Sequence, residues 1–118
     1  DKLNKFNIKL NRNIIVSTPL GFFDFIKLEK NAKCVISDSG TVQEETCILG
    51  VPSITIRETT ERRETIECGS NILSGTRYND IMESFNIMIK KNNTWIIPND
   101  YLVKNVSDIV INILSSKK

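Results

Sequence analysis

Short apolar runs alternate along the chain with longer segments in which apolar residues recur at helical spacing. Four runs rich in isoleucine, valine or leucine predict buried strands, because turn-forming or charged residues bound them. They lie at Ile14–Ser17, Cys34–Ile36, Ser53–Arg57 and Asn71–Ser74. Helical spacing predicts five further elements, at Phe22–Lys30, Thr41–Leu49, Thr59–Glu67, Tyr78–Lys91 and a final helix from about Val103.

Strands and helices alternate with short connections, and this order predicts right-handed crossovers and a parallel sheet. The expected fold is therefore α/β, with a Rossmann-like parallel sheet and helices on both of its faces. Each of the last two predicted helices has an apolar stripe on one face. The stripes are Ile81, Met82, Phe85, Met88 and Ile89 in the first, and Val106, Ile109, Val110, Ile113 and Leu114 in the second.

A length of 118 residues predicts a single domain that spans residues 1–118. Residues 1–13 form a polar lead-in without a helix or strand start. We expect this lead-in to be the cut end of a longer chain.

Composition excludes several classes of function. Apolar residues make up 40% of the chain, charged residues 25%, and the net charge is +2, which gives no electrostatic footprint for nucleic acid. The longest apolar runs are too short for a membrane span, and no signal-peptide pattern is present. Three widely spaced cysteines without any histidine argue against a metal site. We expect reduced thiols and a cytoplasmic protein.

The most informative stretch runs from Ile36 to Thr46, where a predicted strand breaks into small polar residues before a helix begins. Ser39, Gly40 and Thr41 lie at this helix start, where unpaired backbone N–H groups and the positive end of the helix dipole suit a phosphate. Thr41 and Glu44 also match a capping box, so a helix cap without any ligand is the alternative. No Gly-x-Gly-x-x-Gly pattern follows a predicted strand, which argues against a nicotinamide dinucleotide site.

Three motifs occur in order along this part of the chain: Ser-Asp-Ser-Gly-Thr-Val-Gln-Glu-Glu at 37–45, Leu-Gly-Val-Pro at 49–52, and Arg-Glu-Thr-Thr-Glu-Arg at 57–62. Together they resemble the non-hydrolysing UDP-N-acetylglucosamine 2-epimerases. The resemblance implies the C-terminal domain of a glycosyltransferase-B fold, whose active site lies between two Rossmann-like domains. It also implies a reaction without cofactor or metal, in which UDP is eliminated and then added back to the other face of the sugar.

The resemblance implies a nucleotide-binding role for six residues: Phe25, Ser39, Gly40, Thr41, Glu45 and Arg62. The turn at 39–41 would bind the diphosphate, Arg62 would contact the phosphates, and Phe25 would lie beside the uracil. Glu45 would accept hydrogen bonds from the ribose hydroxyls, a role that suits a carboxylate, as phosphate binding suits a guanidinium. The structural alternatives are a surface glutamate, a solvated arginine and a core phenylalanine.

Two positions depart from the family pattern. Thr41 stands where many members have a second glycine, and Arg63 where many have proline. The Ser-Gly-Thr version resembles branches that act on other amino sugars in surface polysaccharide pathways, so UDP-N-acetylglucosamine, UDP-N-acetylmannosamine or a related UDP-amino sugar remains open as the substrate.

The family's catalytic residues lie upstream of the matching region, and this chain has no histidine. We therefore expect no catalytic residue in this segment and an isolated chain that is inactive. The expected partners are a UDP-sugar and a missing N-terminal domain, with a homodimer as a further expectation. Two other functions stay open: the donor-nucleotide domain of a glycosyltransferase with the same architecture, and a non-catalytic nucleotide-binding module.

Overall fold

The computed structural model describes residues 2–116; Asp1 of the predicted lead-in and residues 117–118 lie outside the described part. The elements in chain order are α1 (Lys2–Lys5), α2 (Phe22–Asn31), β1 (Val35–Ser37), α3 (Gly40–Leu49), β2 (Ser53–Thr55), α4 (Arg63–Glu67), β3 (Asn71–Leu73), α5 (Tyr78–Met88), the 3-10 helix η1 (Asn99–Leu102) and α6 (Val106–Ser115).

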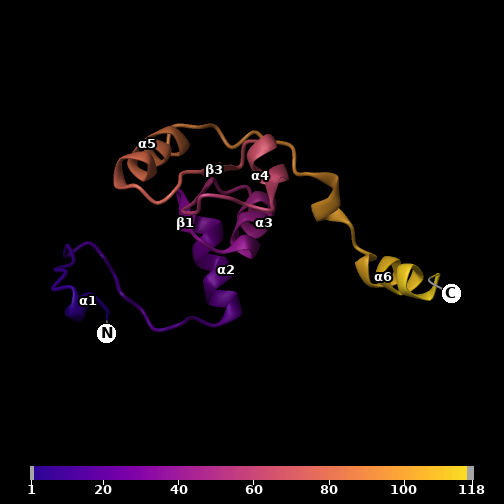
Figure 1. The fold of residues 1–118 in the computed structure, drawn as a ribbon, viewed down its shortest axis with the longest axis horizontal. Coiled ribbons are helices and arrows are strands. Elements are labelled where there is room, and N and C mark those ends of the chain that lie inside the picture. The colour runs from indigo at the N-terminus through magenta and orange to yellow at the C-terminus, as the bar shows by residue number, and fades with distance from the viewer. Residues whose placement is uncertain (1, 117–118) are drawn as a thin grey trace.

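The strands form one parallel sheet in the order β1-β2-β3. Their carboxyl ends are level, because Ser37 pairs with Thr55 and Thr55 with Leu73. In Figure 1, α2 and α3 lie on one side of the sheet and α5 on the other. The predicted α/β fold with a Rossmann-like parallel sheet is confirmed.

Local chemistry accounts for the central boundaries. Gly50 adopts a left-handed conformation with φ of 73°, which ends α3 with a residue that bears no Cβ penalty. Pro52 then precedes β2, where its missing N–H leaves no ladder hydrogen bond unmade. The predicted helices over α2, α3 and α5 and the three strands β1 to β3 are confirmed. The elements β2, β3 and α5 end earlier than predicted, and β1 lies one residue later. The predicted helix at Thr59–Glu67 begins only at Arg63.

The core of the described residues is small and unusually polar. Its buried apolar side chains are Val42, Cys47, Val51, Ile54 and Met88. Polar side chains share this interior, notably Gln43, Thr65 and Asn71, each at most 2% exposed. Buried polar groups are costly unless they are hydrogen-bonded, so an interior of this kind implies a connected network of side-chain hydrogen bonds.

The strand predicted at Ile14–Ser17 is wrong. These residues form no strand, and Ile15 is 92% exposed. Within the described residues, β1 pairs only with β2, and no strand pairs with its other edge. An apolar run becomes a strand only where it pairs with a neighbouring strand and packs against a surface. Residues 14–17 neither pair with a strand nor pack against a surface that buries them.

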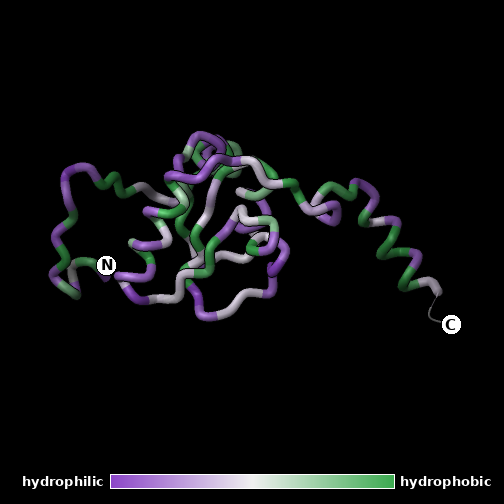
Figure 2. The backbone as a smooth tube through the Cα atoms, turned by 90° about the horizontal axis from the view of Figure 1, so that it is seen from above, coloured by the Kyte–Doolittle hydropathy of each residue, from purple (hydrophilic) through white to green (hydrophobic). Residues whose placement is uncertain are grey.

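The lead-in and the last helix also differ from expectation. Residues 2–5 form the short helix α1 where no helix start was expected. The helix α6 begins at Val106 rather than near Val103, and its apolar stripe is exposed along its length. Figure 2 shows this stripe on a helix that extends away from the sheet. The radius of gyration is 17.2 Å, against about 13 Å for a compact domain of this length.

The three cysteines, Cys34, Cys47 and Cys68, are free thiols, as predicted. Burial raises the pKa of Cys34 and Cys47 to about 11, so both remain protonated at neutral pH and are poor nucleophiles. The carbonyl of Cys47 accepts a hydrogen bond from Trp95 Nε1 at 3.1 Å, which ties the segment after α5 to α3. Within residues 2–116, no helix has the length and apolar character needed to cross a bilayer.

Candidate functional site

The turn at residues 39–41 lies at the carboxyl end of β1 and opens α3. Ser39 is the N-cap residue, in an extended conformation, and its N–H donates to Ser37 Oγ at 3.1 Å. The hydroxyls of Ser39 and Thr41 lie 3.2 Å apart, and neither caps the helix through a side-chain hydrogen bond. A ten-residue helix therefore presents uncapped N–H groups at the sheet edge where α/β folds bind ligands.

Arg62 lies directly over Gly40. A Cβ placed on Gly40 would be 3.5 Å from Arg62 Cζ and 3.6 Å from Arg62 Nε. These are ordinary van der Waals distances, so the guanidinium lies against the first residue of α3. The helix N-terminus and the arginine, 22 positions apart in sequence, thus form one corner that holds backbone N–H groups and a guanidinium.

Two carboxylates orient the Arg62 guanidinium. Its Nε donates to Glu44 Oε1 at 2.8 Å, and its Nη1 forms an ion pair with Glu61 Oε1 at 3.2 Å. A guanidinium has five N–H donors, and neither carboxylate contacts Nη2, so the two N–H groups of Nη2 remain for a ligand. The predicted capping box between Thr41 and Glu44 is wrong, because Ser39 is the N-cap residue and Thr41 lies inside the first turn of α3. The Glu44 carboxylate instead pairs with Arg62 on the facing loop.

Glu45 points to a different side of α3 from Glu44. No donor among the described residues hydrogen-bonds to its carboxylate. Its electrostatic neighbour is Glu29 on α2, the helix that packs against α3. Glu29 is 3% exposed, and neither of its carboxylate oxygens has a hydrogen-bond partner. Desolvation, and then the charge of Glu45, raise the pKa of Glu29.

We expect Glu29→Gln to raise the midpoint of thermal unfolding at pH 7. The pKa of Glu29 is higher in the folded than in the unfolded chain, so its contribution to stability is present below the ordinary value of 4.5 and is lost as pH rises through the raised value. Glutamine removes this loss. Calorimetry at pH 7 and pH 4 should show a larger gain at pH 7, whereas Glu83→Gln on the exposed side of α5 should show no such difference. An equal shift at both pH values would contradict the assignment.

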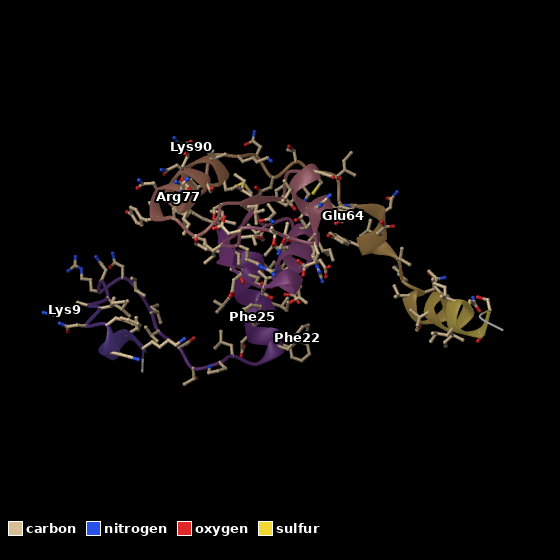
Figure 3. All side chains as sticks on the ribbon, viewed as in Figure 1. Lys9, Phe22, Phe25, Glu64, Arg77 and Lys90 are labelled. Carbon is tan, nitrogen blue, oxygen red and sulfur yellow. The ribbon has the colours of Figure 1, made fainter. Side chains whose placement is uncertain are left out.

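Phe25 lies one helical turn before Glu29 on α2, and Figure 3 labels it there. It is 39% exposed and lines a cavity of about 310 Å³ beside β1 with Leu28, Glu29 and Ile36 among others. The structure therefore places Phe25 near the Glu29–Glu45 side of α3 and not in the Arg62 corner. Its predicted place beside a uracil stays a prediction.

The carboxyl ends of the next two strands border a further cavity of about 380 Å³. Its lining residues include Arg57, Glu58, Ser74, Gly75 and Arg77. The turn at 39–41 does not line this cavity. The turn and the cavity lie at the carboxyl ends of different strands of the same sheet.

The segment after α5 also returns to this edge. Burial, followed by the charges of Glu64 and Glu44, raises the pKa of Tyr101 to about 12, so this η1 phenol remains protonated beside the Arg62 corner. No sequence pattern indicated that Tyr101 lies here.

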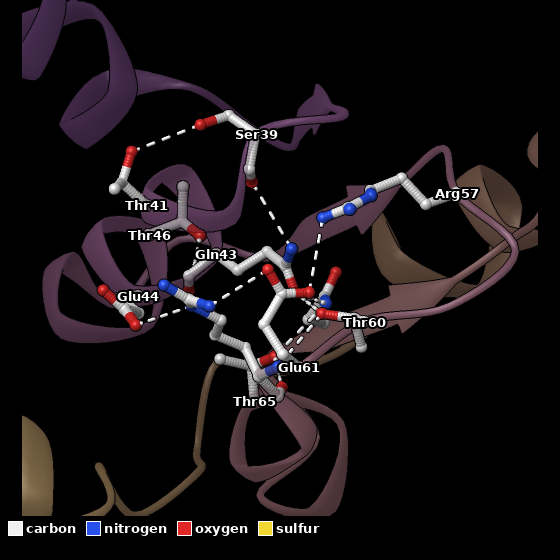
Figure 4. A network of polar contacts seen from close by, with 11 residues as sticks. Ser39, Thr41, Gln43, Glu44, Thr46, Arg57, Thr60, Glu61 and Thr65 are labelled. Atoms are coloured by element: carbon white, nitrogen blue, oxygen red, sulfur yellow. Dashed lines mark hydrogen bonds and ion pairs between the residues drawn. The ribbon is translucent and has the colours of Figure 1, made fainter.

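Sequence reasoning also missed a buried network between the turn and Arg62, which Figure 4 shows. Gln43 Nε2 donates to the Ser39 carbonyl at 3.4 Å, and Gln43 Oε1 accepts from Thr60 Oγ1 at 2.8 Å and Asn71 Nδ2 at 3.2 Å. One signal was available: Gln43 lies four positions after Ser39, on the helix face that also carries Gly40.

This arrangement can hold an anion, through the N–H groups of the turn and the Arg62 guanidinium, and a diol, through the free carboxylate of Glu45. Glu44 is bound to Arg62 and Glu29 is buried, so neither carboxylate is free for proton transfer. The geometry suits binding of a polar, negatively charged ligand.

Comparison with known proteins also leads to negatively charged, nucleotide-like ligands, because the relatives are enzymes that act on UDP-sugars. The profile of the family described as UDP-N-acetylglucosamine 2-epimerase matches residues 1–115. The UDP-N-acetylglucosamine 2-epimerase of Methanococcus maripaludis is 42% identical over 121 residues, which cover 99% of this chain and 32% of the relative. The chain therefore spans about a third of that relative's length.

Solved structures agree. The crystal structure of Methanocaldococcus jannaschii UDP-GlcNAc 2-epimerase in complex with UDP-GlcNAc and UDP superposes with a TM-score of 0.84 at 40% identity, covering 97% of this chain and 32% of that one. The Neisseria meningitidis UDP-GlcNAc 2-epimerase bound to UDP-GlcNAc superposes with a TM-score of 0.65 at 32% identity, covering 84% and 28%.

Proposed function

Because the chain belongs to the UDP-N-acetylglucosamine 2-epimerase family, we propose that it is the C-terminal, nucleotide-binding part of such an enzyme. The complete enzyme would interconvert UDP-N-acetylglucosamine and UDP-N-acetylmannosamine, or a related UDP-amino sugar, by elimination and re-addition of UDP. The observation that carries this proposal is the position of the Arg62 guanidinium over Gly40 at the uncapped start of α3. That corner combines backbone N–H donors at a helix start with a guanidinium, and both are groups that bind phosphates.

The proposed roles follow from this placement. The Ser39–Thr41 turn and Arg62 bind the diphosphate from two sides. Glu45 lies on the next turn of the same helix, and its unpaired carboxylate accepts the two ribose hydroxyls. Phe25, across the α2–α3 contact from Glu45, borders the base.

We further propose an N-terminal domain outside this sequence as the second wall of the site. The chain covers 32% of the Methanococcus relative, and its apolar surfaces call for a partner. One edge of β1, the Ile14–Val16 segment and the α6 stripe are uncovered in the described structure. Large exposed apolar surfaces of this kind mark interfaces. A homodimer and a cytoplasmic location also belong to the proposal, the latter supported by the free thiols. The reaction would use no cofactor.

The isolated chain should bind UDP weakly. A ligand of about 25 non-hydrogen atoms gains about 0.3 kcal/mol of binding free energy per atom in a complete site, which corresponds to a Kd of a few micromolar. A chain that makes only half of those contacts would bind the same ligand with a Kd of about 1 mM. Calorimetric titration with UDP and with UDP-N-acetylglucosamine tests this expectation. If free N-acetylglucosamine, without nucleotide, bound as well as UDP, the nucleotide site would be refuted.

A further inference from the structure

Arg62 is held by its backbone as well as by its side chain. Its N–H donates to Thr60 Oγ1 at 3.1 Å, and its carbonyl accepts from Thr65 Oγ1 at 2.7 Å. The side-chain ion pairs to Glu44 and Glu61 are partly exposed, and such pairs fix a long side chain only weakly. The backbone contacts therefore determine where α4 begins and from which point the guanidinium reaches Gly40.

Thr60 is itself fixed by Gln43. The Thr60 hydroxyl gives its single proton to Gln43 Oε1, which leaves its lone pairs to accept the Arg62 N–H. The opposite end of the same amide donates to the Ser39 carbonyl. Gln43 is 1% exposed, so water does not compete for these contacts. One side chain thus joins the turn at 39–41 to the loop that carries Arg62 (Figure 4).

Asn71 completes the connection from β3. Its Nδ2 donates to Gln43 Oε1 and to Thr65 Oγ1, both at 3.2 Å, and its Oδ1 accepts from Thr55 Oγ1 at 3.0 Å. The two donors on Gln43 Oε1 fix the orientation of that amide. Both backbone contacts of Arg62 therefore lead back to Gln43, one through Thr60 and the other through Thr65 and Asn71.

We propose that Gln43 is a positioning residue, whose buried amide sets the distance between the Arg62 guanidinium and the diphosphate-binding turn. The inference rests on the proposed function and extends it to a residue that would not touch the nucleotide. Loss of the amide releases the Arg62 loop from the turn. Contacts to the phosphates then weaken, while contacts to uracil and ribose, which do not involve Arg62, are retained.

The test measures the Kd for UDP and for uridine in the full-length gene product that contains this sequence. Gln43→Leu removes both amide ends at similar volume, and we expect it to raise the Kd for UDP about tenfold and to change that for uridine less than twofold. Thr46→Val is the matched control. Thr46 is fully buried on the same helix, but its hydroxyl donates only to carbonyls of α3. It should leave both ligands unaffected. Equal losses for UDP and uridine in Gln43→Leu would overturn the proposal.

A second readout separates positioning from general damage. In an Arg62→Ala background, Gln43→Leu should change the Kd for UDP less than twofold, because no guanidinium remains to be positioned. Additive losses would overturn the inference. Thr60→Val, which removes only the bridging hydroxyl, gives the same test if Gln43→Leu fails to fold. If the wild-type protein bound no UDP, both the proposed function and this inference would fail, whereas UDP binding that Gln43→Leu leaves unchanged would refute the inference alone.

Discussion

Arg62→Ala should raise the Kd for UDP by about 10- to 100-fold, the largest effect expected of any single substitution on binding by this chain. A hydrogen bond to a charged group contributes about 1.5–3 kcal/mol, and each 1.4 kcal/mol is a factor of ten. The loss has a second source. Without the guanidinium, the Glu44 carboxylate, 2.8 Å from Arg62 Nε, would face the phosphates uncompensated.

Arg57→Ala and Arg63→Ala are matched controls, since each lowers the net charge by the same one unit. Arg57 pairs with Glu61, and Arg63 lies on the exposed start of α4, so neither guanidinium lies over Gly40. Their effects on calorimetric titrations with UDP should stay within about threefold. If all three substitutions had indistinguishable effects, the contribution of Arg62 would reduce to net charge.

The isolated chain should not exchange the C2 proton of UDP-N-acetylglucosamine in deuterated water, and exchange should appear when an N-terminal half is supplied. Epimerisation needs a base and an acid within hydrogen-bond reach of C2 on opposite faces of the sugar. Of the carboxylates near the turn, Glu44 binds Arg62, Glu29 is buried and Glu45 lies beside Glu29, which leaves the exposed Asp38. A single carboxylate cannot serve as base and acid on opposite faces of the sugar. Proton NMR of the C2 resonance follows the loss of signal directly.

The control for this experiment is buffer without protein, together with Glu45→Gln. Exchange by the isolated chain above the protein-free rate, abolished by Glu45→Gln, would mean that Glu45 acts as a base and that the ribose assignment is wrong. Exchange restored by an N-terminal half but lost with Arg62→Ala would instead agree with an Arg62 that binds the departing diphosphate.

The central β-α-β units were predictable because their signals are local. A short apolar run, a glycine that ends a helix and a proline that precedes a strand act within a few residues, as at Gly50 and Pro52. The pattern therefore predicted β1 to β3 and the helices between them. The same local chemistry placed Ser39 and Gly40 at the start of α3, and the motif resemblance identified Arg62 as their partner across 22 residues of sequence.

Where a local rule met a competing long-range contact, the sequence prediction was wrong. Thr41 and Glu44 satisfy the capping-box pattern, yet the Glu44 carboxylate binds Arg62 from another loop. Residues 14–17 have strand composition, yet they stay exposed and do not pair with the free edge of β1. The α6 stripe has core spacing but no core against it, because periodicity identifies an apolar face without identifying what covers it.

The sequence by itself thus determined the order of elements, the turn at 39–41 and the residue types available for binding a phosphate. Only the tertiary structure decided that the Arg62 guanidinium lies over Gly40, that Glu29 is buried beside Glu45, and that Gln43 links the turn to the Arg62 loop. The physical reason is range. Backbone propensity and capping act over three or four residues, whereas charge pairing and buried hydrogen bonds depend on which distant segments the packing of α3, α4 and β3 brings together.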